Sequence, residues 1–488
     1  MSLSLALNKA LSGLTTTSRQ ADITSSNVAN ALTEGYARRD AVISEIVVGG
    51  AGAGSRVESV QRAASPFAAE ARRLADAEAG RASTLSDASA RLADAIGEPG
   101  DDRSLSASAS RLEAALATAA DTPESEAILK AAVNAAGDFA ASINRIAVEV
   151  ATLRTEADAS IARKVEAING SLQKIKSLNA EIQTRALQGD DITALQDQRA
   201  RLIKSISSEI PIKVAQRENE QVALFTTNGG QLLDGKTFEL GFTPTPNVGP
   251  SQTLANGALS GLTVDGRAFR IGEGDGRGFF DGGALAAAFE LRDVRLAEVG
   301  DDIDALAEDV ALRAQGLAAD PTITAVDAGV FTDAGAAYDP ADRVGLALRL
   351  TVNPAVDPAE GGEARRLRDG VASLAPGDTG ESVVLRALQD AFAAQVAAPG
   401  GASLTGARSA FGFATELASG VVADAAIDER SAAFESGRAF ALAEAEAADL
   451  GVDTDQELSR LLVIERAYAA NARVIQVVDD LLERLLSI

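Results

Sequence analysis

Apolar residues near both ends of the chain recur at alternating steps of three and four positions. This spacing predicts an amphipathic helix that runs to about Asn30, and a second one that reaches the last residues. Both patterns are close to a heptad, so each helix has a narrow apolar seam. The seam positions are Leu3, Leu7, Ala10, Leu14, Thr17, Ala21, Thr24 and Val28 in the first helix, and Leu461, Ile464, Tyr468, Asn471, Ile475, Val478, Leu482 and Leu485 in the second.

Heptads that reach both ends of a chain are unusual, because chain ends are the least ordered parts of most domains unless something holds them. The pattern therefore predicts that the terminal helices pair with each other as a coiled coil, or pack on neighbouring subunits. An ordinary bundle core is the alternative. Thr17, Thr24 and Asn471 make the seam only moderately hydrophobic, which favours ends that stay mobile alone and order on assembly.

Between these ends the sequence predicts a long helical region. An apolar stripe from Phe139 to Ile182 persists over several heptads and indicates a long rod, with Asn169-Gly170 as its one weak position. Two earlier segments, 68–96 and 105–120, are rich in Ala and charged residues and predict further helices.

The pattern changes after Pro211. Short runs rich in Val, Phe, Leu and Thr alternate with turn signals such as Asn228-Gly229 and Asp265-Gly266, which predicts a small β domain. Helical periodicity returns at 285–317, a strand is expected at 344–352, and helices follow from about Ser382.

The predicted fold class is therefore mainly α with an inserted small β domain, and with a long helical bundle as the second domain. The expected division is a terminal-helix domain (1–45 plus 440–488), a long helical domain (46–208 plus 284–439) and the β insertion (209–283).

Composition narrows the possible functions. The chain has 45 basic and 70 acidic residues, a net charge of −25, which disfavours nucleic acid and anionic membranes as partners. It contains no Cys and no His, so the usual nucleophile pairs, imidazole shuttles and zinc sites are excluded. We expect no enzyme activity, no cofactor and no metal. The sequence has no uninterrupted apolar run long enough to predict membrane insertion. Its first residues do not resemble a cleaved secretory signal.

Two glycine-rich segments are interpreted as structural and not as ligand-binding loops. Gly49–Gly54 follows a predicted strand but lacks the Lys-Ser/Thr of a phosphate loop, so a flexible connector is expected. Gly272–Gly278 offers carboxylate oxygens, but its spacing departs from a calcium loop and favours a turn.

Two longer motifs resemble a known family. Residues 25–39, which contain Asn27-Val28-Ala29-Asn30 and Gly35-Tyr36, resemble the amino-terminal signature of flagellar rod, hook and hook-associated proteins. Residues 458–475 resemble the matching carboxyl-terminal helix. Between them, Leu195-Gln196-Asp197-Gln198-Arg199 and the strands that follow resemble the hook-associated protein 1 family.

This resemblance implies a structural subunit of the bacterial flagellum that forms the junction between hook and filament and lets the filament assemble. It implies self-association into a ring or short helical array, contacts with the hook protein and a second junction protein, and an export chaperone on the carboxyl-terminal helix. The location would be the extracellular flagellum, reached by type III export without signal cleavage. A hook or distal rod subunit is the alternative, and a non-flagellar coiled-coil scaffold is a third. The expected assembly residues are Leu3, Leu7, Leu14, Asn27, Asn30, Gly35, Tyr36, Leu461, Ile464, Tyr468, Asn471, Ile475, Val478, Leu482 and Leu485.

Overall fold

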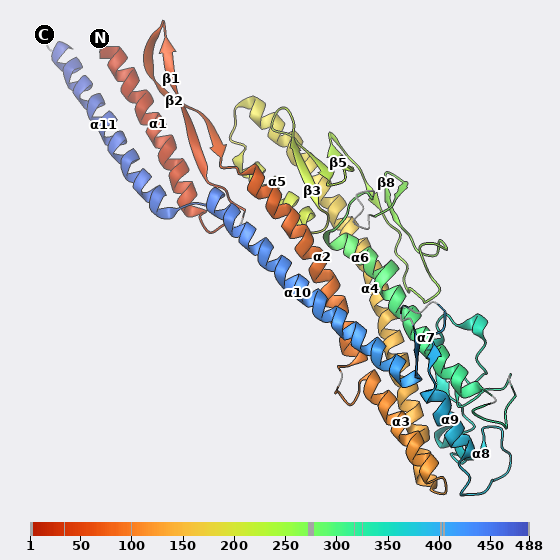
Figure 1. Ribbon diagram of the computed structural model, residues 1–488. Helices are drawn as coiled ribbons and strands as arrows, with labels where there is room; N and C mark the ends of the chain where they lie inside the picture. The colour runs from red at the N-terminus through yellow and green to blue at the C-terminus, as the bar shows by residue number, and fades with distance from the viewer. Residues whose placement is uncertain are drawn as a thin grey trace.

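The protein is an elongated molecule with both chain ends at one tip (Figure 1). The computed structural model describes residues 3–33, 35–98, 100–271, 278–316, 318–324, 326–400, 403 and 406–486. Residues 272–277, for which the sequence favours a turn over a calcium loop, lie outside this range.

The tip that carries the chain ends is formed by two helices and a hairpin. Helix α1 (Leu3–Ala29) lies beside α11 (Thr454–Leu486) on one side and beside strands β1 (Arg39–Val48) and β2 (Ala51–Arg62) on the other. We call these four elements the terminal module. The chain passes between the module and the rest of the molecule at 63–65 and 451–453.

The β1–β2 hairpin corrects the expectation of a flexible connector at Gly49–Gly54. Gly49 and Gly50 form its two-residue turn, in which both residues have positive φ, 60° and 81°; this backbone suits the twist of a hairpin and favours glycine. Gly54 lies so close to α1 that an added Cβ would meet Ser12 Oγ at 2.0 Å. The glycines are therefore needed for the turn and for close packing of the hairpin on α1.

The remaining helices form the body, and α4 is its longest element. At 63 residues it extends about 95 Å at the usual rise of a helix. The body helices are α2 (Pro66–Ile96), α3 (Leu105–Asp121), α4 (Glu126–Gln188), α5 (Thr193–Ser207), α6 (Gly283–Glu290), α7 (Leu296–Gln315), α8 (Arg366–Asp369), α9 (Val383–Ala393) and α10 (Ala410–Leu450).

Two small antiparallel sheets cover one side of α4. The first has the order β3-β4-β5-β6 and the second β7-β8-β9. Their strands are β3 (Ile212–Gln216), β4 (Val222–Thr226), β5 (Gln231–Asp234), β6 (Lys236–Thr237), β7 (Leu240–Gly241), β8 (Leu262–Val264) and β9 (Arg267–Phe269).

Asparagine side chains on α4 hold these sheets in place. Asn169 donates from Nδ2 to the carbonyl of Leu240 at 2.7 Å and accepts from the same residue's N–H at 3.0 Å. Asn179 donates to the carbonyl of Val222 at 2.8 Å. The position that the sequence marks as weak in the helix is therefore an attachment point for the second sheet, and the helix continues through it.

The apolar core has two parts that share α4. The first half of α4 forms one part of the core together with α2, α3, α7, α9 and α10, around side chains such as Phe139, Ile143 and Ile146. Its second half packs against α5, α6 and the sheets around Ile161, Ile168 and Leu172, among others.

A fully buried ion pair joins α4 to the helix that follows the sheets. A short π-helical turn, Leu291–Arg295, places Arg292 inside the protein. Arg292 Nη1 lies 2.7 Å from Asp158 Oδ1, and both side chains have no exposed surface. Asp158 also accepts from the Thr245 N–H at 2.6 Å. Because every charged group in this pair has partners, burial is tolerated.

Residues 318–409 are largely irregular. They contain β10 (Phe331–Asp333), which pairs with β11 (Leu350–Val352), and the pair β12 (Val396–Ala397) and β13 (Ala407–Arg408). The strand expected at 344–352 is correct only for its last three residues. A 3₁₀ turn at Leu346–Leu348 precedes it, because Gly345 has a positive φ of 79° and turns the chain.

The long helix α10 packs its apolar side on the core. One helical stretch, Ala410–Arg484, contains an 18-residue window with mean hydropathy 1.3, enough to cross a membrane by length and composition alone; 39% of this window is buried in the structure. Phe411, Phe413 and Leu417 of α10 lie in the body core, which gives these apolar residues a packing role.

The expected fold class is confirmed at the level of a mainly helical chain, 60% helical, with a few small sheets. The coiled-coil geometry of the terminal pair and the three-part domain division stay predictions. Helix α10 continues through residue 440 and ends at Leu450.

We predict that Asp158→Asn lowers the free energy of unfolding by about 3 kcal/mol, because it leaves the buried Arg292 short of one compensating charge. Chemical denaturation followed by circular dichroism measures this. The control is Asp138→Asn on the exposed side of the same helix, for which a change within about 0.5 kcal/mol is expected. Equal effects of the two variants would contradict the role assigned to the buried pair.

Candidate functional site

The residues of the amino-terminal motif meet the start of α11 at the base of the terminal module. Asn27 is fully buried there. Its Nδ2 donates to the carbonyl of Arg39 at 2.9 Å and to Glu457 Oε2 at 3.2 Å. Its Oδ1 accepts from the Tyr36 hydroxyl at 2.9 Å and from the Arg39 N–H at 3.0 Å. One amide side chain thus joins α1, the turn, β1 and α11.

Glu457 is the second centre of this base. Its side chain is 1% exposed and accepts from Arg38 Nε at 2.6 Å. The same Arg38 donates its backbone N–H to the carbonyl of Leu450, the last residue of α10, at 2.9 Å. The hydrogen bond to Glu457 raises the pKa of the Arg38 guanidinium. Arg38 therefore contacts both sides of the break between α10 and α11.

Three successive residues, Arg38 just before β1 and Arg39 and Asp40 within it, bind alternately to the terminal helix α11 and to the body. Asp40 accepts from Arg38 Nη1 at 2.7 Å and from Arg460 of α11 at 2.5 Å. Arg39, between them, reaches Asp197 of α5 instead. This is the alternation of side chains along a strand, and it lets three consecutive residues connect the terminal helices with the body.

Asp197 holds the base of the hairpin on the body. Arg62 Nε lies 2.6 Å from its Oδ1, and Arg39 Nη2 lies 3.2 Å from its Oδ2. Arg39 and Arg62 are partners across the hairpin, so both strands are bound by one carboxylate. The Asp197 side chain is 5% exposed. We call Asp197, Arg39 and Arg62 the Asp197 clamp.

The Gly-Tyr turn supports the clamp from one side. The guanidinium of Arg39 lies 4.7 Å from the centre of the Tyr36 ring, a cation–π contact. Burial raises the pKa of the Tyr36 phenol, and the charge of Arg39 opposes this shift. Gly35 has a φ of 77°, and an added Cβ would meet Arg201 Cγ at 2.8 Å, so glycine is favoured by both backbone and space.

Arg199, two residues after Asp197, binds the body and not the module. Its Nη1 donates to Asn179 Oδ1 at 2.9 Å and to the carbonyl of Glu220 at 2.7 Å. Burial lowers the pKa of Arg199 to about 10. The Asp-Gln-Arg motif thus alternates between the terminal module and the β sheets.

The predicted seam residues mostly lie between α1 and its neighbours. Asn27, Ile464 and Val478 are buried. Gly35 is exposed, as are Tyr468 and Leu482, at 44% and 37%. Leu485 belongs to α11, but its side chain lies outside the described part. The half-buried residues are Leu3, Leu7, Leu14, Asn30, Tyr36, Leu461, Asn471 and Ile475.

A close approach fixes the two helices at mid-length. Gly13 of α1 faces Asn471 of α11, and a Cβ at Gly13 would lie 2.8 Å from Asn471 Nδ2. The polar seam residue therefore occupies space that a larger residue at position 13 would crowd, and this contact favours the observed alignment of the helices.

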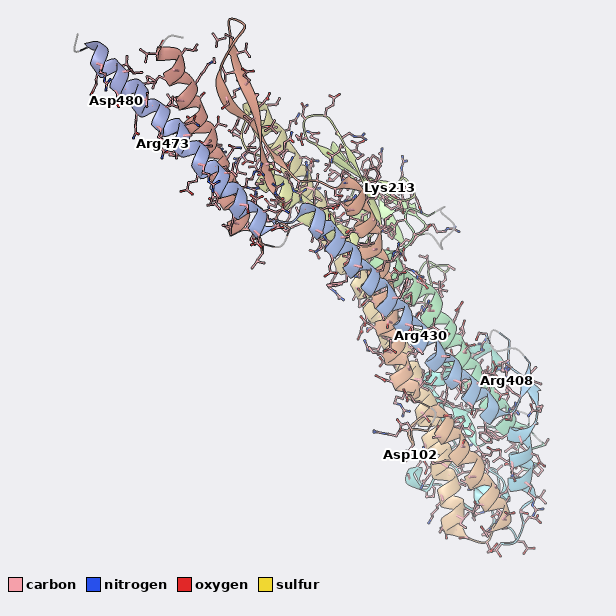
Figure 2. The ribbon with its side chains drawn as sticks, turned by 60° about the vertical axis from the view of Figure 1, so that its left-hand side comes forward. Asp102, Lys213, Arg408, Arg430, Arg473 and Asp480 are labelled. Carbon is pink, nitrogen blue, oxygen red and sulfur yellow. The ribbon has the colours of Figure 1, made fainter. Side chains whose placement is uncertain are left out.

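A second apolar stripe on α11 faces solvent. Its members, which we call the outer face of α11, are each 44–63% exposed: Val463, Val474, Val477 and Leu481. Figure 2 shows Arg473 and Asp480 of the same helix at the end of the molecule opposite Asp102. A helix that is apolar on more than one side indicates a further packing partner.

The sequence motifs contained part of this site. Arg38, Arg39 and Asp197 lie within the quoted motifs, but nothing in the pattern showed that they meet. Arg460 lies within the carboxyl-terminal motif, whereas Glu457 and Arg62 were missed, because their partners lie far away in the sequence. Among the described residues no group of three or more His, Cys, Asp or Glu side chains is placed to hold a metal ion.

Comparisons with known families divide along the same parts. Residues 89–318 match the family described as "Flagellar hook-associated protein FlgK helical domain". Residues 7–36 match "Flagella basal body rod protein", and residues 450–488 match "Flagellar basal body rod FlgEFG protein C-terminal". The two rod-type matches cover α1 with its turn and α11, and the first match covers much of the body.

One relative aligns with nearly the whole chain, and one solved structure aligns with about half of it. Flagellar hook-associated protein 1 of Bacillus subtilis (strain 168) is 22% identical over 515 residues, which cover 95% of this chain and 94% of that protein. A solved structure, the flagellar hook junction protein FlgK from Burkholderia pseudomallei, aligns at 19% identity with a TM-score of 0.43 and covers 54% of this chain and 46% of its own.

We predict that Asn27→Ala speeds amide hydrogen exchange of Arg39 by about 30-fold or more, because the buried N–H loses its acceptor and Tyr36 loses its partner. Hydrogen exchange read by NMR or mass spectrometry measures this. The matched control is Asn30→Ala, since the side chain of Asn30, just after α1, bonds to nearby residues: its Nδ2 donates to the carbonyl of Ser26 and its Oδ1 accepts from Thr33. Similar acceleration in both variants would show that Asn27 is not the centre of the base.

The Tyr36 phenol should ionise only above its ordinary pKa of about 10, since burial raises that pKa. The hydrogen bond to Asn27 then contributes stability that is fully present below the unfolded pKa and is lost as pH rises through the folded one. Ultraviolet titration of the native protein minus Tyr36→Phe isolates this phenol. A difference curve with its midpoint at or below the ordinary value would refute the expectation.

Proposed function

Because the chain belongs to the flagellar hook-associated protein family, we propose that it is a structural subunit of the junction between hook and filament, on which the filament assembles. The observation that carries this is the order of the family matches: a hook-associated helical domain at 89–318, enclosed by rod-type sequences at both ends. A rod or hook subunit would share the ends but not that helical domain.

The outer face of α11 supports an assembly role for the terminal module. Each of its Leu and Val side chains is still 44–63% exposed, so covering it completely contributes roughly half of the 1.5–3 kcal/mol that full burial provides, and a neighbour that covers several of them gains substantial affinity. Contacts between different faces of identical subunits continue into a ring or a helix. We therefore propose a ring or short helical array of copies packed through their terminal modules.

The two ends of such an array contact different partners. We propose that the hook protein lies on one side and a second junction protein on the other. The predicted assembly residues, from Leu3 to Leu485, belong to α1, the Gly-Tyr turn and α11, and their role in these contacts remains a proposal. The acidic surface, with a net charge of −25, favours protein partners over nucleic acid or anionic lipid.

A free subunit with an exposed apolar helix face is prone to premature association. We propose that an export chaperone covers the outer face of α11 before assembly. The subunit then acts outside the cell, in the flagellum, and we propose that it is exported without signal cleavage.

Cells that lack this protein should make hooks without filaments and release flagellin monomers into the medium, because export continues while the platform for the filament is missing. Electron microscopy and an immunoblot of the medium test this. Absent hooks would instead assign the protein to the rod or hook, and normal filaments would refute the flagellar function.

Complementation of these cells identifies the surface. Val477→Glu, on the outer face of α11, should fail to restore filaments, whereas Gln476→Glu adds the same group at a neighbouring exposed polar position and should restore them. Circular dichroism of both purified variants checks that they fold alike. Filaments with Val477→Glu would exclude this face as an assembly contact.

A further inference from the structure

The terminal module is attached to the body through few contacts. The chain crosses between them at 63–65 and 451–453, two three-residue segments without regular structure. These crossings lie side by side, because Ser65 Oγ donates to Asp449, just before the second crossing, at 2.9 Å. Two adjacent segments without regular structure define one axis about which the module can turn.

A wide cleft separates the module from the body on one side of this axis. It measures about 1930 Å³. Arg19 of α1 and Glu58 of β2 line the module side, and Arg73 of α2 and Gln216 of β3 line the body side. Among the described elements, β2 of the module and α5 of the body make the most extensive contact between the two parts.

The contact between β2 and α5 is the Asp197 clamp. It consists of a buried carboxylate on the body and two arginines on paired hairpin strands. Arg62, one of these arginines, also lines the cleft. The clamp therefore fixes the angle of the hairpin, and of the α1 helix packed on it, relative to the body.

We propose that the Asp197 clamp is a latch that fixes the width of the cleft, and that its release lets the terminal module turn about 63–65 and 451–453 and change that width. Ion pairs suit this task because they are directional and reversible, whereas an interdigitated apolar contact would resist any change of angle. A neighbouring molecule that binds one angle more tightly would shift the population toward it.

The test uses pulsed electron spin resonance on the purified full-length protein. The chain has no Cys, so spin labels attach only at the introduced pair Glu58→Cys and Gln216→Cys, two exposed residues on opposite sides of the cleft. In the otherwise native protein we expect one narrow distance distribution. In Asp197→Asn we expect a distribution about twice as wide, as hinge motion is released.

The matched control is Asp190→Asn, which removes the same charge from an exposed residue that lines the same cleft and should leave the distribution narrow. Arg62→Gln removes one of the two arginines of the clamp and should broaden the distance distribution to an intermediate degree. If Asp197→Asn loses its helical circular dichroism and so does not fold, Arg62→Gln provides the test instead. Distributions equal to the native one in the folded clamp variants, or equal broadening in the control, would overturn the latch. The readout is independent of flagellar assembly, so it separates this inference from the proposed function.

Discussion

The arrangement of the whole molecule depends on how three consecutive residues, Arg38 just before β1 and Arg39 and Asp40 within it, divide their side chains. Arg38 and Asp40 bind the start of α11, and Arg39 binds α5 of the body. A strand offers this alternation at no cost, but it needs a fixed register. Asn27 supplies that register, because it both donates to and accepts from the backbone of Arg39.

Polar and apolar interactions hold different parts of this protein together. The body is organised on α4, whose apolar face is continuously buried and whose Arg154, Asp158, Asn169 and Asn179 fasten the sheets and loops. The terminal module meets the body through hydrogen bonds and ion pairs instead. A small rotation of one part against another opens gaps in a close-packed apolar interface. Hydrogen-bonded charges instead specify the direction of each contact. The body is thus built for rigidity, and its joint with the module for a defined angle.

Helical periodicity predicted the long helices well, because α2, α3, α4 and the terminal helices bury one stripe each and length makes such a stripe readable. The β1–β2 hairpin was only half recognised. The first five residues of β2, Ala51-Gly52-Ala53-Gly54-Ser55, have little β propensity. This part of the strand is held by hydrogen bonds between Ser55 and the side chains of Ser12 and Thr16 on α1. The site was recognised where it is local, at Asn27 and Tyr36, and missed where it is not, since Glu457 lies 430 positions from Asn27.

The helix α11 has two apolar series on neighbouring faces, and not only the one that a single heptad pattern requires. Its inner stripe, with Ile464 and Val478 buried, packs within the module. A second series, Val463, Ala470, Val474, Val477 and Leu481, follows the same steps of seven, four, three and four on a neighbouring face. A solitary helix pair needs only the first series. Retaining both costs solubility in the free subunit, and this cost is offset only in a state where two sides of α11 are covered, as in an array of identical terminal modules.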